Sequence, residues 1–117
     1  MEVFANLVGV TFRPAEAKTI VKALTSEDGD KLVLEAEPDN EYDNHAVKVN
    51  FAPTGLHIGY LARENNFEVF QALQNNEELT IEIVGFENTL KPTLLISSIE
   101  GQALAHEPEA EDQEPLA

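Results

Sequence analysis

Apolar and polar residues alternate along the chain with two periods, one typical of strands and one typical of helices. Residues 3–12 are apolar and β-branched enough for a first strand, in which Gly9 indicates a bulge or a close backbone approach. A helix is expected next, because Pro14 suits a first helical turn. Its buried face is formed by apolar residues with helical spacing, namely Ala17, Ile20, Val21 and Leu24.

The rest of the chain predicts five more strands and one more helix. The strand at 31–37 alternates Leu32, Leu34 and Ala36 with polar residues. The other strands are expected at 46–51, 56–60, 79–86 and 93–99. A helix at 62–75 carries Phe67, Phe70 and Leu73 on one side, which is expected to lie in the core. Six short strands and two helices within about 100 residues predict a mixed, mainly β domain, a small partly closed six-stranded β-barrel with two helices packed at its ends.

Length and composition describe one domain followed by a tail. The chain has 117 residues, of which 43% are hydrophobic, and this is enough for a single core spanning residues 1–100. Residues 101–117 are rich in Pro, Glu and Ala, so they predict a disordered acidic tail. There is no cysteine, which excludes disulfides and zinc–thiolate sites. No basic leader and no membrane-spanning apolar run are found, so we expect a cytoplasmic protein with no membrane partner.

The net charge is −15, from 22 acidic and seven basic residues. Five of the acidic residues lie in the tail: Glu107, Glu109, Glu111, Asp112 and Glu114. Without them 17 acidic and seven basic residues remain, so the body itself has a net charge of −10. A surface with this much negative charge repels nucleic acid at long range. Binding of nucleic acid depends largely on Lys and Arg side chains that neutralise phosphates. The same charge also serves solubility.

The polar stretch EPDNEYDNH at 37–45 lies between two apolar runs and is typical of a turn. A calcium loop does not fit, because Asn44 stands where an EF-hand needs glycine and Asn50 where it needs glutamate. A metal site on His45 lacks a second histidine nearby. The chain has no Gly-rich phosphate loop, no cysteine nucleophile and no recognisable serine–histidine–acid motif. We therefore expect no metal, no cofactor and no catalytic residue.

Three segments, in this order, resemble the HIRAN domain: VGVTFR at 8–13, EPDNEYDNHAVKV at 37–49 and IGYL at 58–61. The resemblance covers residues 4–99. HIRAN domains occur in helicase-like chromatin-remodelling and fork-remodelling ATPases, and also as free-standing modules in bacteria and phages, the type expected here. The resemblance implies an OB-like or SH3-like barrel. In fork-remodelling members this barrel captures the 3′-hydroxyl end of single-stranded DNA.

The resemblance also implies roles for individual residues. By position, Phe12 and Tyr42 correspond to aromatic residues that stack on bases. Asp43 corresponds to the carboxylate that accepts a hydrogen bond from the terminal 3′-hydroxyl. This role is chemically sensible, because a carboxylate accepts from a hydroxyl group and repels a phosphate.

Asn40 is implied to bond to the base or backbone nearby, and Tyr60 and Arg63 to reach phosphates. One position departs from the family pattern. End-binding members have an arginine before the early aromatic residue, where this chain has Thr11, and Arg13 follows the aromatic residue instead.

Each of these residues also has a structural alternative. Tyr60 can pack at the strand-to-helix junction with its hydroxyl group in water, and Arg63 can form a salt bridge with one of the many carboxylates. Phe12 can be partly in the core, and the ring of Tyr42 can cover the end of the barrel. Asn40 and Asp43 can simply satisfy backbone donors of the loop.

Two functions follow from the sequence. The first is a non-catalytic HIRAN-like module that binds single-stranded DNA, at 3′-hydroxyl ends, in DNA repair or replication-fork processing. The second keeps the fold and uses the acidic surface as a protein-interaction module or DNA mimic that binds a basic nucleic-acid-processing protein. The position of the carboxylates distinguishes the two functions: if they lie away from the face of Phe12, Tyr42 and Asp43, DNA binding is compatible with the net charge.

Overall fold

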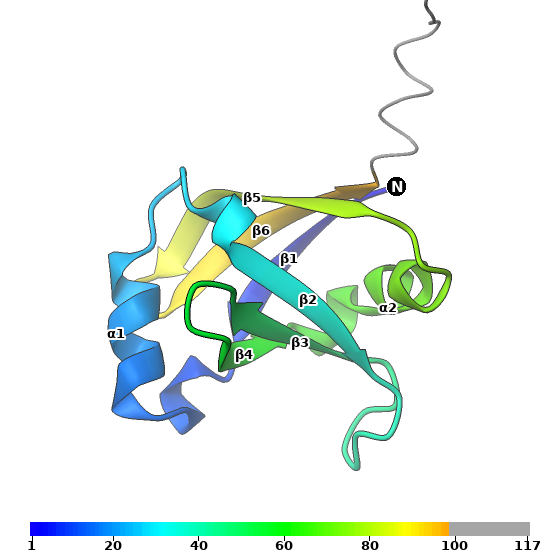
Figure 1. The fold of residues 1–117 in the computed structure, drawn as a ribbon, viewed down its shortest axis with the longest axis horizontal. Helices are drawn as coiled ribbons and strands as arrows, with labels where there is room; N and C mark the ends of the chain where they lie inside the picture. The colour runs from blue at the N-terminus through cyan, green and yellow to red at the C-terminus, as the bar shows by residue number, and fades with distance from the viewer. Residues whose placement is uncertain (99–117) are drawn as a thin grey trace, which may run out of the picture.

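Six antiparallel strands form one strongly curled sheet, with a helix packed at each side (Figure 1). The computed structural model describes residues 1–98. The strands are β1 (Glu2–Val8), β2 (Leu32–Glu37), β3 (Ala46–Phe51), β4 (Leu56–Leu61), β5 (Leu79–Asn88) and β6 (Lys91–Ser98). The helices are α1 (Ala15–Ala23) and α2 (Phe67–Gln74). The strand order is β2-β3-β4-β1-β6-β5, so the first strand lies inside the sheet and β2 and β5 form its edges.

The two edges approach each other at one point, and the sheet thereby becomes a half-barrel. The short turn η2 (Gly29–Lys31), directly before β2, packs against the middle of β5. A Cβ atom at Gly29 would lie 2.3 Å from the main-chain oxygen of Ile81. Only glycine therefore allows this contact between the two edges.

The core lies inside the curl of the sheet. Its largest fully buried side chains come from strands on both halves, among them Leu7, Ile58, Leu94 and Ile96. Ala17 and Val21 of α1 close one side and Val69 of α2 the other, all of them fully buried. The fold class, mainly β with six strands and two helices in a partly closed barrel, is thus confirmed.

The first strand is shorter than the sequence predicts. It ends at Val8, because Gly9 adopts a left-handed conformation with φ 79° and turns the chain into the 3-10 turn η1 (Val10–Phe12). Gly9 thus terminates the strand, and the prediction of a strand reaching residue 12 with a bulge inside it is wrong.

The second predicted helix is divided into two pieces. The 3-10 turn η3 (Arg63–Asn65) comes first, and α2 begins only after Asn66. Two consecutive asparagines, which form helices poorly, lie at the division. The buried face of α2 consists of Val69, Phe70 and Ala72, whereas Phe67 is about half exposed, so its expected place in the core is wrong.

The last hairpin is longer than predicted, with only two residues, 89 and 90, between β5 and β6. Residue 99 and the expected tail at 101–117 lie outside the described residues. Within residues 1–98, no helix is both long and apolar enough to cross a membrane.

The contact at Gly29 predicts the effect of one added methyl group. Gly29→Ala should lower the free energy of unfolding by about 1–3 kcal/mol, because the methyl group must displace main-chain atoms of β5. Gly85→Ala is the matched control, since nothing lies within 4 Å of its added Cβ, and it should change stability by less than about 0.5 kcal/mol. Urea unfolding of the two variants measures the difference; equal stabilities would contradict closure of the barrel at Gly29.

Candidate functional site

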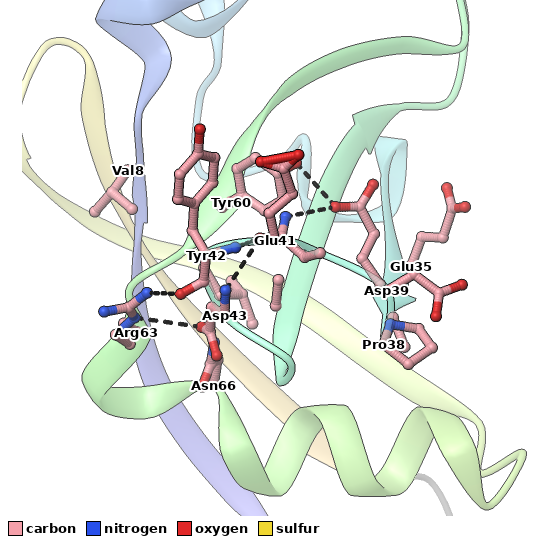
Figure 2. A pocket seen from close by; sticks show the side chains of 15 residues that line it. Val8, Glu35, Pro38, Asp39, Glu41, Tyr42, Asp43, Tyr60, Arg63 and Asn66 are labelled. Atoms are coloured by element: carbon pink, nitrogen blue, oxygen red, sulfur yellow. Dashed lines mark hydrogen bonds and ion pairs between the residues drawn. The ribbon is translucent and has the colours of Figure 1, made fainter.

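An open pocket of about 810 Å³ lies between the β2–β3 loop, the end of β4 and η3 (Figure 2). Five of the seven residues predicted as site residues line it: Asn40, Tyr42, Asp43, Tyr60 and Arg63. The loop at 38–45 contributes six of the 15 lining residues, more than any other segment. The sequence pattern therefore brings these five residues together, as a single site requires.

Side-chain hydrogen bonds to its own backbone shape the β2–β3 loop. Oδ1 of Asn40 accepts from the amides of Tyr42 at 2.8 Å and Asp43 at 3.1 Å. Nδ2 of Asn40 donates to Glu37 Oε1 at 3.1 Å, so both ends of its side chain are engaged within the loop. Oδ1 of Asp43 accepts from the amide of His45 at 2.9 Å. The structural role expected for Asn40 and Asp43 is thus present, and it orders the loop that carries Tyr42.

The side chain of Asp43 has polar contacts with three neighbours, and it is 17% exposed. Its Oδ2 accepts from Nδ2 of Asn66 at 2.8 Å and lies 3.6 Å from Nε of Arg63. Partial burial raises the pKa of the Asp43 carboxyl, but the hydrogen bonds from His45 and Asn66 and the charge of Arg63 outweigh it. The pKa therefore lies below its ordinary value, and the group is an ionised acceptor at neutral pH.

Asn66 is a site residue that the sequence did not reveal. It is 3% exposed and lies between η3 and α2, where its amide reaches across to the β2–β3 loop. The pair of asparagines that divides the predicted helix is the sequence feature that could have indicated it. Beside it, the ring of His45 meets the ring edges of Phe67 at 4.7 Å and Phe70 at 5.5 Å, which holds the end of the loop against α2.

Arg63 joins η3 to the loop at the exposed side of the pocket. Its Nη2 donates to the main-chain oxygen of Tyr42, and its Nε faces Asp43, as the dashed lines in Figure 2 show. The guanidinium has five N–H donors, so most of them stay available to a ligand.

Tyr60 and Glu37 form the opposite wall. The hydroxyl group of Tyr60 donates to Glu37 Oε1 at 2.9 Å, and Lys48 Nζ lies 3.9 Å from Glu37 Oε2. Burial raises the pKa of Glu37, but hydrogen bonds from Asn40 and Tyr60 and the charge of Lys48 lower it by more. The pKa of Glu37 therefore lies below its ordinary value. Burial and the bond to Glu37 raise the pKa of Tyr60. The Tyr60 hydroxyl is thus occupied by a carboxylate.

Phe12 and Arg13 do not line the pocket. Phe12 is 89% exposed, so the alternative that places its ring partly in the core is wrong. Tyr42 is 82% exposed, so its ring does not cover the end of the barrel. Arg13 donates from Nε to the main-chain oxygen of His57 at 3.1 Å, and the ring of His57 lies 4.8 Å from that of Tyr60.

The charges of the pocket are mostly negative. Five of its lining residues are acidic: Glu35, Glu37, Asp39, Glu41 and Asp43. Arg63 is the single basic residue among those that line it. The carboxylates therefore lie on the same face as Tyr42 and Asp43 and not away from it, which is the arrangement less favourable to DNA binding, and this limits how much phosphate the pocket can accept. Residues 1–98 contain no group of three or more His, Asp or Glu side chains that could hold a metal ion.

A family model of the HIRAN domain matches residues 1–93, so the chain belongs to the HIRAN domain family. Two solved structures share its fold at 19% sequence identity each. One is a protein from Lactobacillus plantarum, with a TM-score of 0.68 over 84% of this chain and 95% of that chain. The other is the HIRAN domain of human HLTF, with a TM-score of 0.62 over 83% of this chain and 74% of that chain. Among curated protein sequences, none matches this chain.

The hydrogen bond from Asn66 to Asp43 predicts that removing the Asn66 side chain changes the pKa of Asp43. Asn66→Ala removes a hydrogen bond to the charged carboxylate, so the pKa of Asp43 should rise toward its ordinary value. The substitution should also cost about 1–3 kcal/mol of stability at neutral pH. Because the folded-state pKa of Asp43 is lowered, its contribution to stability is present above the unfolded-state pKa. That contribution is lost as the pH falls through the folded-state pKa. The loss on acidification should therefore be smaller in the variant.

Carboxyl NMR titration measures the pKa of Asp43, and urea unfolding at neutral and acid pH measures the stability. Asn65→Ala is the matched control, since Asn65 is exposed and its side chain makes no hydrogen bond within residues 1–98. An Asp43 pKa that stays unchanged in Asn66→Ala would contradict the role given to Asn66.

Proposed function

We propose that the chain is a non-catalytic HIRAN module that binds single-stranded DNA at a free 3′-hydroxyl end, in DNA repair or replication-fork processing. The single observation that carries the proposal is the pairing of Asp43 and Tyr42 in one pocket. Asp43 is an ionised acceptor held by three neighbours, and the adjacent aromatic ring is almost fully exposed. An exposed aromatic ring beside such an acceptor offers a face on which a base can stack.

The chemistry of this pair suits the end of a strand. A terminal 3′-hydroxyl can donate to Asp43, whereas a 3′-phosphate at the same place would be repelled by it. The last base can stack on Tyr42, a contact worth about 1–3 kcal/mol per base. Arg63 stands beside both residues and can bind the phosphate that joins the last two nucleotides.

The acid-lined pocket agrees with capture of an end. A strand running through the pocket would place phosphates on both sides of each nucleoside, next to five carboxylates. A terminal nucleoside has a phosphate on its 5′ side only, so it meets less repulsion.

The carboxyl groups also favour binding over catalysis. The pKa values of Asp43 and Glu37 are both lowered, so neither group is poised to exchange a proton near neutral pH, as a general acid or base must be. Asn40 serves the proposed site by ordering the loop, and Tyr60 by holding Glu37.

A binding experiment with a labelled oligonucleotide tests the proposal. Fluorescence anisotropy at low salt should show binding of a single strand that ends in a 3′-hydroxyl, and at least tenfold weaker binding of the same strand with a 3′-phosphate. Asp43→Asn should remove most of this preference, since the amide keeps the shape and loses the charge. Tyr42→Ala should weaken binding of both strands, by about 1–3 kcal/mol.

Phe4→Ala is the control for Tyr42, because Phe4 is also exposed but lies on β1 away from the residues that line the pocket. It should leave the affinity unchanged. If the unaltered chain binds neither strand at low salt, where attraction to Arg63 is least screened, nor at moderate salt, where the long-range repulsion is screened, the proposal is wrong.

The acidic lining of the pocket favours a second candidate, an interaction module that binds a basic nucleic-acid-processing protein. Asp39 and Glu41 are exposed, and neither makes an ion pair or a side-chain hydrogen bond within residues 1–98, so both are available to cations. In this case the carboxylates imitate the phosphates of DNA.

The two candidates predict opposite effects of the same substitutions. Asp39→Asn combined with Glu41→Gln should strengthen the binding of single-stranded DNA, because it removes repulsion at the pocket. The same pair should weaken the binding of a cationic probe such as an oligolysine peptide. Anisotropy with both probes measures the signs; tighter oligolysine binding than DNA binding, lost in the double variant, would favour the second candidate.

A further inference from the structure

The basic residues of the chain fall into two groups. All seven lie within residues 1–98, and four of them form ion pairs: Lys31 with Asp28, Lys48 with Glu37, Arg63 with Asp43 and Lys91 with Glu87. The other three, Arg13, Lys18 and Lys22, have no carboxylate within 4.0 Å in the part of the chain that the structure describes. The cations that are not neutralised therefore belong to a single segment.

That segment comprises η1 and α1, residues 10–23, and it contains one acidic residue, Glu16. It therefore has a local excess of positive charge within a body whose net charge is −10. Lys18 and Lys22 are four residues apart, so their side chains leave the same face of α1 about one turn from each other. The buried face of α1, with Ala17 and Val21, is a different one.

The segment begins beside the pocket. Val8 and Tyr60 pair between β1 and β4 and both line the pocket, and η1 starts two residues after Val8. The bond from Arg13 to His57, whose ring stacks edge-on against Tyr60, ties the segment to the same wall. In Figure 1, the blue segment before α1 and the loop between β2 and β3 both extend from the lower end of the barrel.

Phe12 adds an apolar contact to these charges. It is 89% exposed and directly precedes Arg13 in the chain, so the segment contains both an exposed aromatic ring and a cation. Aromatic rings that alternate with cations are the usual means by which proteins bind a single strand without sequence preference.

We propose that Phe12, Arg13, Lys18 and Lys22 form a phosphate track, which binds the backbone of the strand 5′ to the nucleotide held in the pocket. The inference rests on the proposed function and extends it, because it says where the strand runs after it leaves the pocket. The acid-lined pocket repels further phosphates, and the track is the nearest surface with unpaired cations. It also explains how a chain of net charge −15 can bind a polyanion.

The track predicts that affinity depends on the length of the strand. A dinucleotide ending in a 3′-hydroxyl reaches the pocket alone, whereas a strand of about 12 nucleotides covers the pocket and the track, within the range of OB-like folds. Each phosphate contact contributes about 0.7 to the slope of log affinity against log salt for single strands.

The experiment compares Lys18→Gln/Lys22→Gln with Lys31→Gln/Lys91→Gln by anisotropy over a range of salt concentrations. Both double variants remove two positive charges, but Lys31 and Lys91 lie elsewhere and are already paired. With the longer strand, the Lys18/Lys22 variant should bind more weakly and its salt slope should fall by about 1.4, from two lost contacts. With the dinucleotide, it should bind as the unaltered chain does, and the control should match the unaltered chain with both strands.

Two other outcomes have different meanings. If both double variants lose the same affinity for the longer strand, net charge alone is responsible and the track is wrong, while end capture stands. If the unaltered chain binds neither strand, the proposed function is wrong, and the track is overturned with it.

Discussion

The candidate site depends on the contacts that the carboxylate of Asp43 makes with its neighbours. The carboxylate accepts from its own loop through His45, from the start of α2 through Asn66, and it faces Arg63 on η3. These neighbours come from two parts of the chain, the loop itself and the segment 63–66, so one side chain sets the position of the loop relative to the helix. Because each contact favours the charged form, the pKa of Asp43 is lowered and the acceptor stays ionised. The contacts that give the loop its structure are therefore also the ones that keep the carboxylate charged.

The charges of the described residues are unevenly distributed, and the proposed binding of DNA by an acidic protein depends on this distribution. Carboxylates surround the pocket, while the cations without ion-pair partners within residues 1–98 lie on η1 and α1. A neutral chain end suits the first region and phosphates suit the second. Net charge, which decides long-range repulsion, thus says little about the short-range fit of a strand that has already arrived.

The sequence predicted the strands well because alternation has a fixed period of two and its register is set by burial, as in β3 at Ala46–Phe51. The sequence-based prediction was wrong where the local backbone conformation determined the end of an element. Gly9, with a positive φ, ended β1 where apolar residues continue to Phe12, and Asn66 divided a helix whose apolar pattern continues. The pocket residues Tyr42 and Asp43 were recognised from a motif. Asn66 was not, because its partner lies 23 residues away and periodicity contains no information on such a contact.

The central claim is that Asp43 accepts a hydrogen bond from a terminal 3′-hydroxyl. A crystal structure of the chain with a short single strand ending in a 3′-hydroxyl tests it most directly. The account predicts the terminal O3′ atom within hydrogen-bond distance of an Asp43 oxygen, with the last base against Tyr42. A strand bound on another face, or bound here with its 5′ end in the pocket, would contradict it.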